Sequence, residues 1–233
     1  MTWRIQLEGD KDDLIDLSKI FTSPEFSINE IDGNFYLFSD SFNSIEDSGL
    51  VEEKGKEFLV IINAGVKLTS NYLREIKTAG VESLNSDGGV KKRFVHLDAE
   101  VRNRAKVELQ ITKADGTVIE DNPFEPLVKW RQLAQEDPLV AKAFYLISHD
   151  FNTWFSLYKL LEIMEEDGFA PLMRDGKYKK EANRFSQTAQ SYAALGLHAR
   201  HIKSTFKAPP DPMSLDEAKS FIRMLVNEWL MTK

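Results

Sequence analysis

The hydrophobic period of the chain changes near Asn122-Pro123, and this change constrains the fold more than any other feature of the sequence. Before that point, short segments such as residues 3–7 alternate apolar and polar side chains, which is typical of half-buried strands. After it, apolar residues recur every three or four positions, which is typical of helices. A chain of 233 residues is long enough for two regions with separate cores. The sequence therefore predicts an α+β protein with two domains, residues 1–121 and residues 122–233.

The first domain is expected to be a small α+β domain with a mainly antiparallel sheet. Strands are predicted at residues 3–7, 26–31, 34–38, 76–84, 93–97 and 105–112. Turns are predicted at Asp32-Gly33, Asp87-Gly88-Gly89 and Asp115-Gly116. Helices are expected directly after Asp10 and at about residues 45–64, because apolar residues share one face there.

The second domain is expected to resemble a four-helix bundle. Segments with helical spacing of apolar residues cover residues 138–148, 152–167, 178–195 and 214–231. The last segment opens with Ser214 and Glu217 at the spacing of a capping box, in which each side chain bonds an amide that the helix leaves unpaired. Three prolines at positions 209, 210 and 212 are expected to keep the preceding connection extended.

Charge is distributed unevenly along the chain. The formal net charge is -7, yet residues 1–122 carry -8 and residues 123–233 carry +1. Within the second region, residues 174–207 form a basic segment with eight cations and two carboxylates. The cations, which we predict to bind an anionic ligand, are Arg174, Lys177, Lys179, Lys180, Arg184, Arg200, Lys203 and Lys207.

The run His198-Ala199-Arg200-His201 lies inside this basic segment and holds two of the four histidines. An imidazole beside a guanidinium can bind phosphate or transfer a proton near neutral pH. His198, Arg200 and His201 are therefore candidate catalytic residues. The alternative is structural: Arg200 and one histidine would bond loop carbonyls and hold the connection to the last helix.

Several classes of protein and site are not expected. The sequence has no cysteine, no apolar run near the roughly 20 residues of a membrane helix, and no secretory signal in its first residues. A cytoplasmic protein without cofactor or metal is the expectation. The acidic residues Glu162, Glu165, Glu166 and Asp167 could hold a metal with His149, but a solvated helix end accounts for them better.

Aromatic residues also recur in the second domain and allow two interpretations. They are Trp130, Phe144, Tyr145, Trp154, Phe155 and Tyr158. Stacking on nucleic acid bases is one interpretation. Packing between helices is favoured, because these residues fall where the helical period places apolar side chains.

The C-terminal part of the chain resembles a known group of domains. Ala199-Arg200-His201, a Pro-rich loop and Met213-Ser214-Leu215-Asp216-Glu217-Ala218 resemble bacterial proteins of unknown function and, more distantly, the HEPN domains of abortive-infection proteins and toxin ribonucleases. The resemblance spans about residues 138–231. It implies a homodimer that cuts RNA without metal, with Arg200 and a histidine at the site. In that group the histidine follows the arginine by four to six residues, whereas His201 follows Arg200 directly.

The function expected from these features is binding of RNA or another anionic ligand by the helical domain. Metal-independent ribonuclease activity in a defence or toxin-like system is the enzymatic form of this expectation. The alternative is a non-enzymatic interaction or scaffold protein whose acidic domain binds a protein partner.

Overall fold

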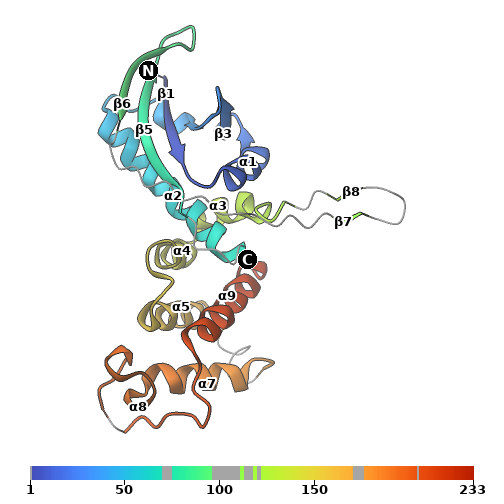
Figure 1. The fold of residues 1–233 in the computed structure, drawn as a ribbon, viewed down its shortest axis with the longest axis vertical. Helices are drawn as coiled ribbons and strands as arrows, with labels where there is room; N and C mark the ends of the chain where they lie inside the picture. Colours follow the sequence, from blue (N-terminus) through green and yellow to red (C-terminus); the bar gives the residue numbers. More distant parts are fainter. Residues whose placement is uncertain are drawn as a thin grey trace. The chain divides into compact units, whose positions relative to one another are not determined.

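The computed structural model describes residues 2–69, 75–95, 111–112, 118–119, 122–169, 176–203 and 205–233. These residues form an α+β fold, as the sequence predicts. The chain divides into two compact units, Met1–Ile62 with Tyr72–Val128 and Asn63–Asn71 with Lys129–Lys233. The first unit contains the sheet and the second is helical (Figure 1). The boundary after residue 121 stays a prediction, and the second unit also includes residues 63–71 from the first half of the sequence.

The main sheet of the first unit is antiparallel, with strand order β2-β3-β4-β1-β5-β6. Its strands are β1 (Thr2–Glu8), β2 (Thr22–Ser23), β3 (Phe26–Ile31), β4 (Asn34–Ser39), β5 (Lys77–Leu84) and β6 (Val90–Val95). A separate pair is formed by β7 (Ile111–Thr112) and β8 (Val118–Ile119). The other residues of the strand expected at 105–112 lie outside the described residues.

The predicted hairpin at Asp32-Gly33 is confirmed. The two turn residues have φ angles of 52° and 76°, and Ile31 pairs with Asn34 across them. This left-handed backbone suits glycine and is tolerated by aspartate, which explains why this dipeptide closes the hairpin.

Helices α1 (Lys11–Ile20) and α2 (Ser48–Thr69) belong to the α/β half of the sequence. The helix expected at residues 45–64 starts later, because the Asp47 carboxylate caps the backbone amides of Gly49 and Leu50 at 2.8 and 3.0 Å. Helix α2 lies so close to the sheet that a Cβ on Gly55 would collide with Ile5. Phe58 of α2 also packs edge-on against Phe26, with ring centroids 5.0 Å apart.

A buried ion cluster crosses three strands of the sheet. The fully buried Glu82 carboxylate binds the Arg4 guanidinium at 2.7 Å and the Arg93 guanidinium at 2.5 Å. Arg4 also lies over the Tyr36 ring, 4.1 Å from its centroid. Two arginines therefore compensate the one buried carboxylate, and the cluster connects β1, β5 and β6.

The helical region contains α3 (Pro126–Glu136), α4 (Pro138–Asp150), α5 (Trp154–Glu166), α7 (Lys179–Gln190), α8 (Tyr192–Leu195), the short η2 turn (Gly196–His198) and α9 (Leu215–Met231). Helix α5 is central to the second unit, because it contacts α4, α7 and α9. The capping box at Ser214 and Glu217 is confirmed. Helices α4 and α5 likewise begin at side-chain caps, Asp137 and Thr153.

Two features of the helical region differ from expectation. The sequence did not predict helix α3. The helix expected at residues 178–195 ends at Gln190, because Ser191 adopts an extended conformation and a second short helix follows. The Arg200 amide donates to the Ala189 carbonyl at 2.8 Å, so the chain returns to the end of α7 instead of continuing it.

No helix in the described part of the chain is both long and apolar enough to cross a membrane.

Candidate functional site

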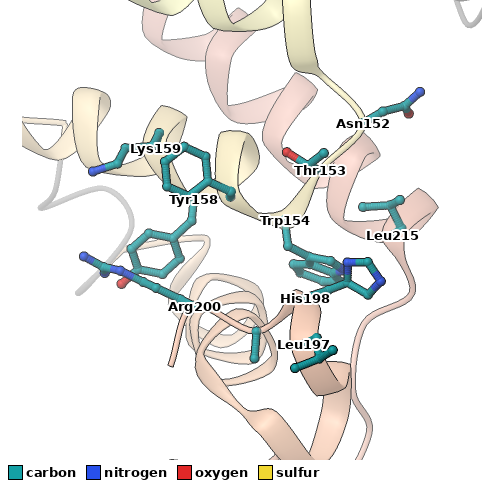
Figure 2. Close-up of a pocket in the computed structure, with 11 residues that line it drawn as sticks. Asn152, Thr153, Trp154, Tyr158, Lys159, Leu197, His198, Arg200 and Leu215 are labelled. Carbon is teal, nitrogen blue, oxygen red and sulfur yellow. The ribbon is translucent and has the colours of Figure 1, made fainter. Parts of the chain in front are cut away.

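The return of the chain after α7 places His198 and Arg200 beside helix α5. Together these segments enclose a cavity of about 560 Å³ in the second unit (Figure 2). Its walls are Asn152, Thr153, Trp154, Phe155, Tyr158, Lys159, Leu197, His198, Ala199, Arg200 and Leu215. Most of these side chains are apolar or aromatic, with a few polar and cationic groups among them, which is the usual composition of a ligand site.

Arg200 is held against the cavity wall by two interactions. Its guanidinium lies 4.3 Å from the centroid of the Tyr158 ring (Figure 2). One of its nitrogens, Nη2, binds Oε1 of Glu162 at 2.8 Å. The Tyr158 hydroxyl accepts a hydrogen bond from the Gln190 amide at 2.9 Å, which fixes the ring beneath the guanidinium. Cation–π stacking and the ion pair thus give Arg200 a defined position.

Glu162 also binds the second cation of the cavity. The Lys159 ammonium lies 2.8 Å from Oε2 of Glu162, one helical turn away on α5. One carboxylate is therefore shared by both permanently charged residues of the cavity wall, Lys159 and Arg200.

The two histidines of the predicted catalytic run lie in different surroundings. His198 is exposed and, like Trp154, belongs to the cavity wall (Figure 2). The His201 ring stacks on Phe206, with centroids 4.6 Å apart and planes at 16°, and His201 is not among the residues that line the cavity. The structure therefore brings His198 and Arg200 to one cavity and leaves His201 outside its wall.

Arg184 connects the Pro-rich loop to helix α9. Its guanidinium binds the carboxylates of Asp211 and Glu217 at 3.0 and 3.1 Å, and its Nε donates to the Asp211 carbonyl at 2.7 Å. These contacts hold the chain ahead of α9, which is the structural role that the sequence had suggested for Arg200.

The other predicted binding residues that the structure describes lie outside the cavity wall. Lys177 binds Glu228 at 3.3 Å, and its hydrogen bonds to Tyr178 and Glu228 raise the pKa of its ammonium. Lys179, Lys180, Lys203 and Lys207 are exposed. Arg174 lies outside the described residues. In the basic segment, Arg200 therefore lines the cavity, Arg184 and Lys177 bind carboxylates, and the other described lysines are exposed.

The aromatic residues also separate into two groups. Trp130, Phe144 and Trp154 are buried, as the packing interpretation expects. Tyr145 and Phe155 are exposed over 57% and 65% of their surfaces, so packing does not account for them. Tyr145 stacks on His149 at 4.2 Å, whereas Phe155 lies in the cavity wall with the Lys159 ammonium 5.9 Å from its ring centroid.

Two aspartates of the first unit have local roles. Asp10 caps α1 through the amides of Asp12 and Asp13, and Asp87 accepts from the Gly89 amide within its turn. Among the described residues, no group of three or more His, Asp and Glu side chains is arranged to hold a metal ion.

No family model, curated protein or solved structure matched the chain. The chemistry of the cavity is therefore the basis for a functional proposal.

Four residues of this site were not predicted from the sequence to belong to it: Phe155, Tyr158, Lys159 and Glu162. The first three line the cavity, and Glu162 binds its cations. Base stacking was one interpretation of Phe155 and Tyr158, but packing was favoured, and Glu162 was interpreted as part of a solvated helix end. The sequence did contain a signal for a binding site, because these positions follow the predicted start of the helix at residue 152 and include a lysine among aromatic residues. What the sequence lacked was the return of Arg200 to this helix.

Proposed function

We propose that the second unit binds single-stranded RNA in the cavity between α5 and the segment from Leu197 to Arg200. The observation that carries this proposal is the presence of an exposed aromatic side chain, Phe155, in the same cavity wall as Lys159 and Arg200. Bases stack on aromatic rings, and phosphates bind lysine and arginine. One cavity wall therefore offers an aromatic ring for the base of a nucleotide and two cations for its phosphate.

Single-stranded RNA fits the site better than a duplex does. The bases of a duplex are stacked inside the helix, so an aromatic side chain in a concave wall can reach only an unpaired base. The cavity volume of about 560 Å³ falls within the range of small-ligand sites. The exposed lysines of the basic segment, Lys180, Lys203 and Lys207, would contact the phosphate backbone without reading its sequence.

Binding of a labelled, unstructured oligouridine tests this proposal, with fluorescence anisotropy measured over a range of salt concentrations. We expect the logarithm of the association constant to fall with that of the salt concentration, by about 0.7 for each phosphate contact. Phe155→Ala should weaken binding by about 1–3 kcal/mol, the value of one stacked base.

Tyr145→Ala is the matched control, because it removes an exposed aromatic ring from α4 outside the cavity wall. It should bind RNA like the wild type. Equal affinities for Phe155→Ala, Tyr145→Ala and the wild type would contradict a base site at Phe155. Absence of RNA binding at low salt would leave the alternative, a protein partner for the acidic first region.

Ribonuclease activity is a second candidate, supported by the presence of His198 and Arg200 in the same cavity wall. In this form of the proposal, His198 takes the proton of the 2′-hydroxyl and Arg200 stabilises the charge on the phosphate in the transition state. Gel analysis of RNA fragments should then show no cleavage by His198→Ala. Cleavage lost in His201→Ala but kept in His198→Ala would assign the base to His201 instead.

The biological setting rests on the HEPN resemblance alone. We propose a cytoplasmic protein of a defence or toxin-like system that acts as a homodimer.

A further inference from the structure

The net charge of the cavity is set by three side chains. Lys159 and Arg200 supply two positive charges, and Glu162 binds both of them at 2.8 Å. Together these three side chains carry one positive charge. The carboxylate of Asp150 accepts hydrogen bonds from the hydroxyls of Thr153 and Ser156 at 2.8 and 2.7 Å. Glu162, by contrast, contacts both cations.

Glu162 is well placed to act on a ligand without touching it. Its side chain keeps about a third of its surface exposed, at 32%, and it is not among the residues that line the cavity. A phosphate that binds Lys159 and Arg200 would therefore lie on the far side of these cations from a fixed negative charge.

Phosphate esters differ in charge at neutral pH. A phosphodiester carries one negative charge, whereas a phosphate monoester carries about 1.5 to 2 negative charges. Lys159 and Arg200 attract the additional charge of a monoester, whereas Glu162 repels it, so the carboxylate reduces the advantage that the two cations would give to a monoester.

We propose that Glu162 lowers the affinity of the cavity for terminal phosphate monoesters relative to phosphodiesters, the internal phosphates of a nucleic acid chain. This inference rests on the proposed binding of RNA and adds the class of phosphate that the cavity takes. Glu162 is thus a specificity-determining residue that acts through the two cations.

The test compares uridine 5′-monophosphate with its methyl ester, which carries the lower charge of a diester. Each is used to displace labelled oligouridine from the full chain. Glu162→Gln should shift the relative affinity toward the monophosphate by about threefold compared with the wild type, the factor for one pair of like charges about 7 Å apart in water. It should also steepen the dependence of RNA binding on salt, by about 0.7 for each cation made available.

Glu166→Gln is the matched control, because it removes the same charge from an exposed position on the same helix, outside the cavity wall. It should keep the preference of the wild type. If Glu162→Gln folds poorly, Glu162→Asp keeps the charge and should also keep the preference.

The outcomes separate this inference from the proposed function. RNA binding with the same ligand preference in Glu162→Gln and the wild type would overturn the inference and leave RNA binding in place. Failure of both mononucleotides to displace the RNA would also overturn it, because the cavity would then not take a single phosphate. Absence of RNA binding in the wild type and in Glu162→Gln would overturn both.

Discussion

Arg184 and Arg200 lie in the same basic segment of the sequence, yet their guanidinium groups have different partners. Arg184 binds carboxylates and carbonyls at the start of α9, whereas Arg200 stacks on Tyr158 in the cavity wall. The difference arises from tertiary contacts that bring residues 27 and 33 positions away to Arg184. These contacts cannot be predicted from the residues that neighbour Arg184 in the sequence.

Alanine substitutions should separate the roles of these two arginines. Arg184→Ala should lower the free energy of unfolding by about 1–3 kcal/mol, because it removes several hydrogen bonds from a charged group. Arg200→Ala should cost at most about 1 kcal/mol, since its ion pair is partly exposed, but should weaken RNA binding strongly. Urea unfolding followed by circular dichroism and RNA anisotropy check the two effects. The reverse pattern would assign the site to Arg184 and the structural role to Arg200.

The limits of sequence reasoning at this site follow from the same cause. The basic segment and its histidines could be identified from composition and spacing, and His198 and Arg200 do line one cavity. Phe155 could not be distinguished from the core aromatic residues by sequence. The helical period shows which residues share a face of the helix, but it does not show which face is covered by other helices. Glu162 was interpreted as part of a solvated acidic helix end, since its cation partner Arg200 lies 38 positions further along the chain.

Among the helices and strands, the helices of the second unit agree best with the positions predicted from the sequence. Caps, helical period and proline positions are local signals, so α4, α5 and α9 begin and end within a few residues of expectation. Helix α3 and the break at Ser191 were missed. The break coincides with the hydrogen bond from the Arg200 amide to the Ala189 carbonyl, a contact that depends on the return of the chain.

The capping box of α9 gives a prediction at this scale. The Ser214 hydroxyl accepts a hydrogen bond from the Glu217 amide at 3.2 Å, and the Glu217 carboxylate accepts from the Ser214 amide at 2.7 Å. Ser214→Ala should lower the free energy of unfolding by about 1 kcal/mol. Chemical denaturation of the full chain measures this loss. Ser220→Ala, in the exposed middle of α9, is the control and should have a smaller effect.

The C-terminal end of α9 gives a prediction on pH. The Lys233 ammonium binds Asp137 and Asp167, each at 2.6 Å. Its hydrogen bond lowers the pKa of Asp137 below the usual 3.8. Burial acts to lower the pKa of Lys233, but the hydrogen bonds to both carboxylates outweigh it and raise that pKa above 10.5.

The signs of these shifts define where the ion cluster stabilises the fold. A lowered Asp137 pKa contributes stability that is present above pH 3.8 and lost as pH falls through the folded-state value. A raised Lys233 pKa contributes stability that is present below pH 10.5 and lost as pH rises through the folded-state value. Denaturation of the wild type and Lys233→Met at several pH values should show a stability difference between these limits that shrinks outside them. A difference independent of pH would contradict the assignment.

At the scale of the whole molecule, the change of hydrophobic period near residue 122 correctly predicted an α+β fold with a sheet in the first half of the chain and helices in the second. It could not predict that the end of α2 belongs to the second unit. An amphipathic pattern shows that a helix buries one face, but the partner of that face is decided by packing. The described end of α2, residues 63–69, groups with the helical unit.

Binding of single-stranded RNA in the cavity of the helical unit can be tested directly by spectroscopy of the four tryptophans. Trp154 lines the cavity, whereas the Trp3 and Trp229 indoles donate to the Ile45 carbonyl and the Asp167 carboxylate at 2.8 and 2.7 Å. Each indole N–H gives one resonance in a ¹⁵N-correlated spectrum, and Trp154→Phe assigns the cavity signal. On titration with oligouridine, we expect the Trp154 indole resonance to shift most and the Trp3 and Trp229 resonances to stay in place. RNA binding that shifts the Trp3 resonance and leaves that of Trp154 unchanged would contradict the account.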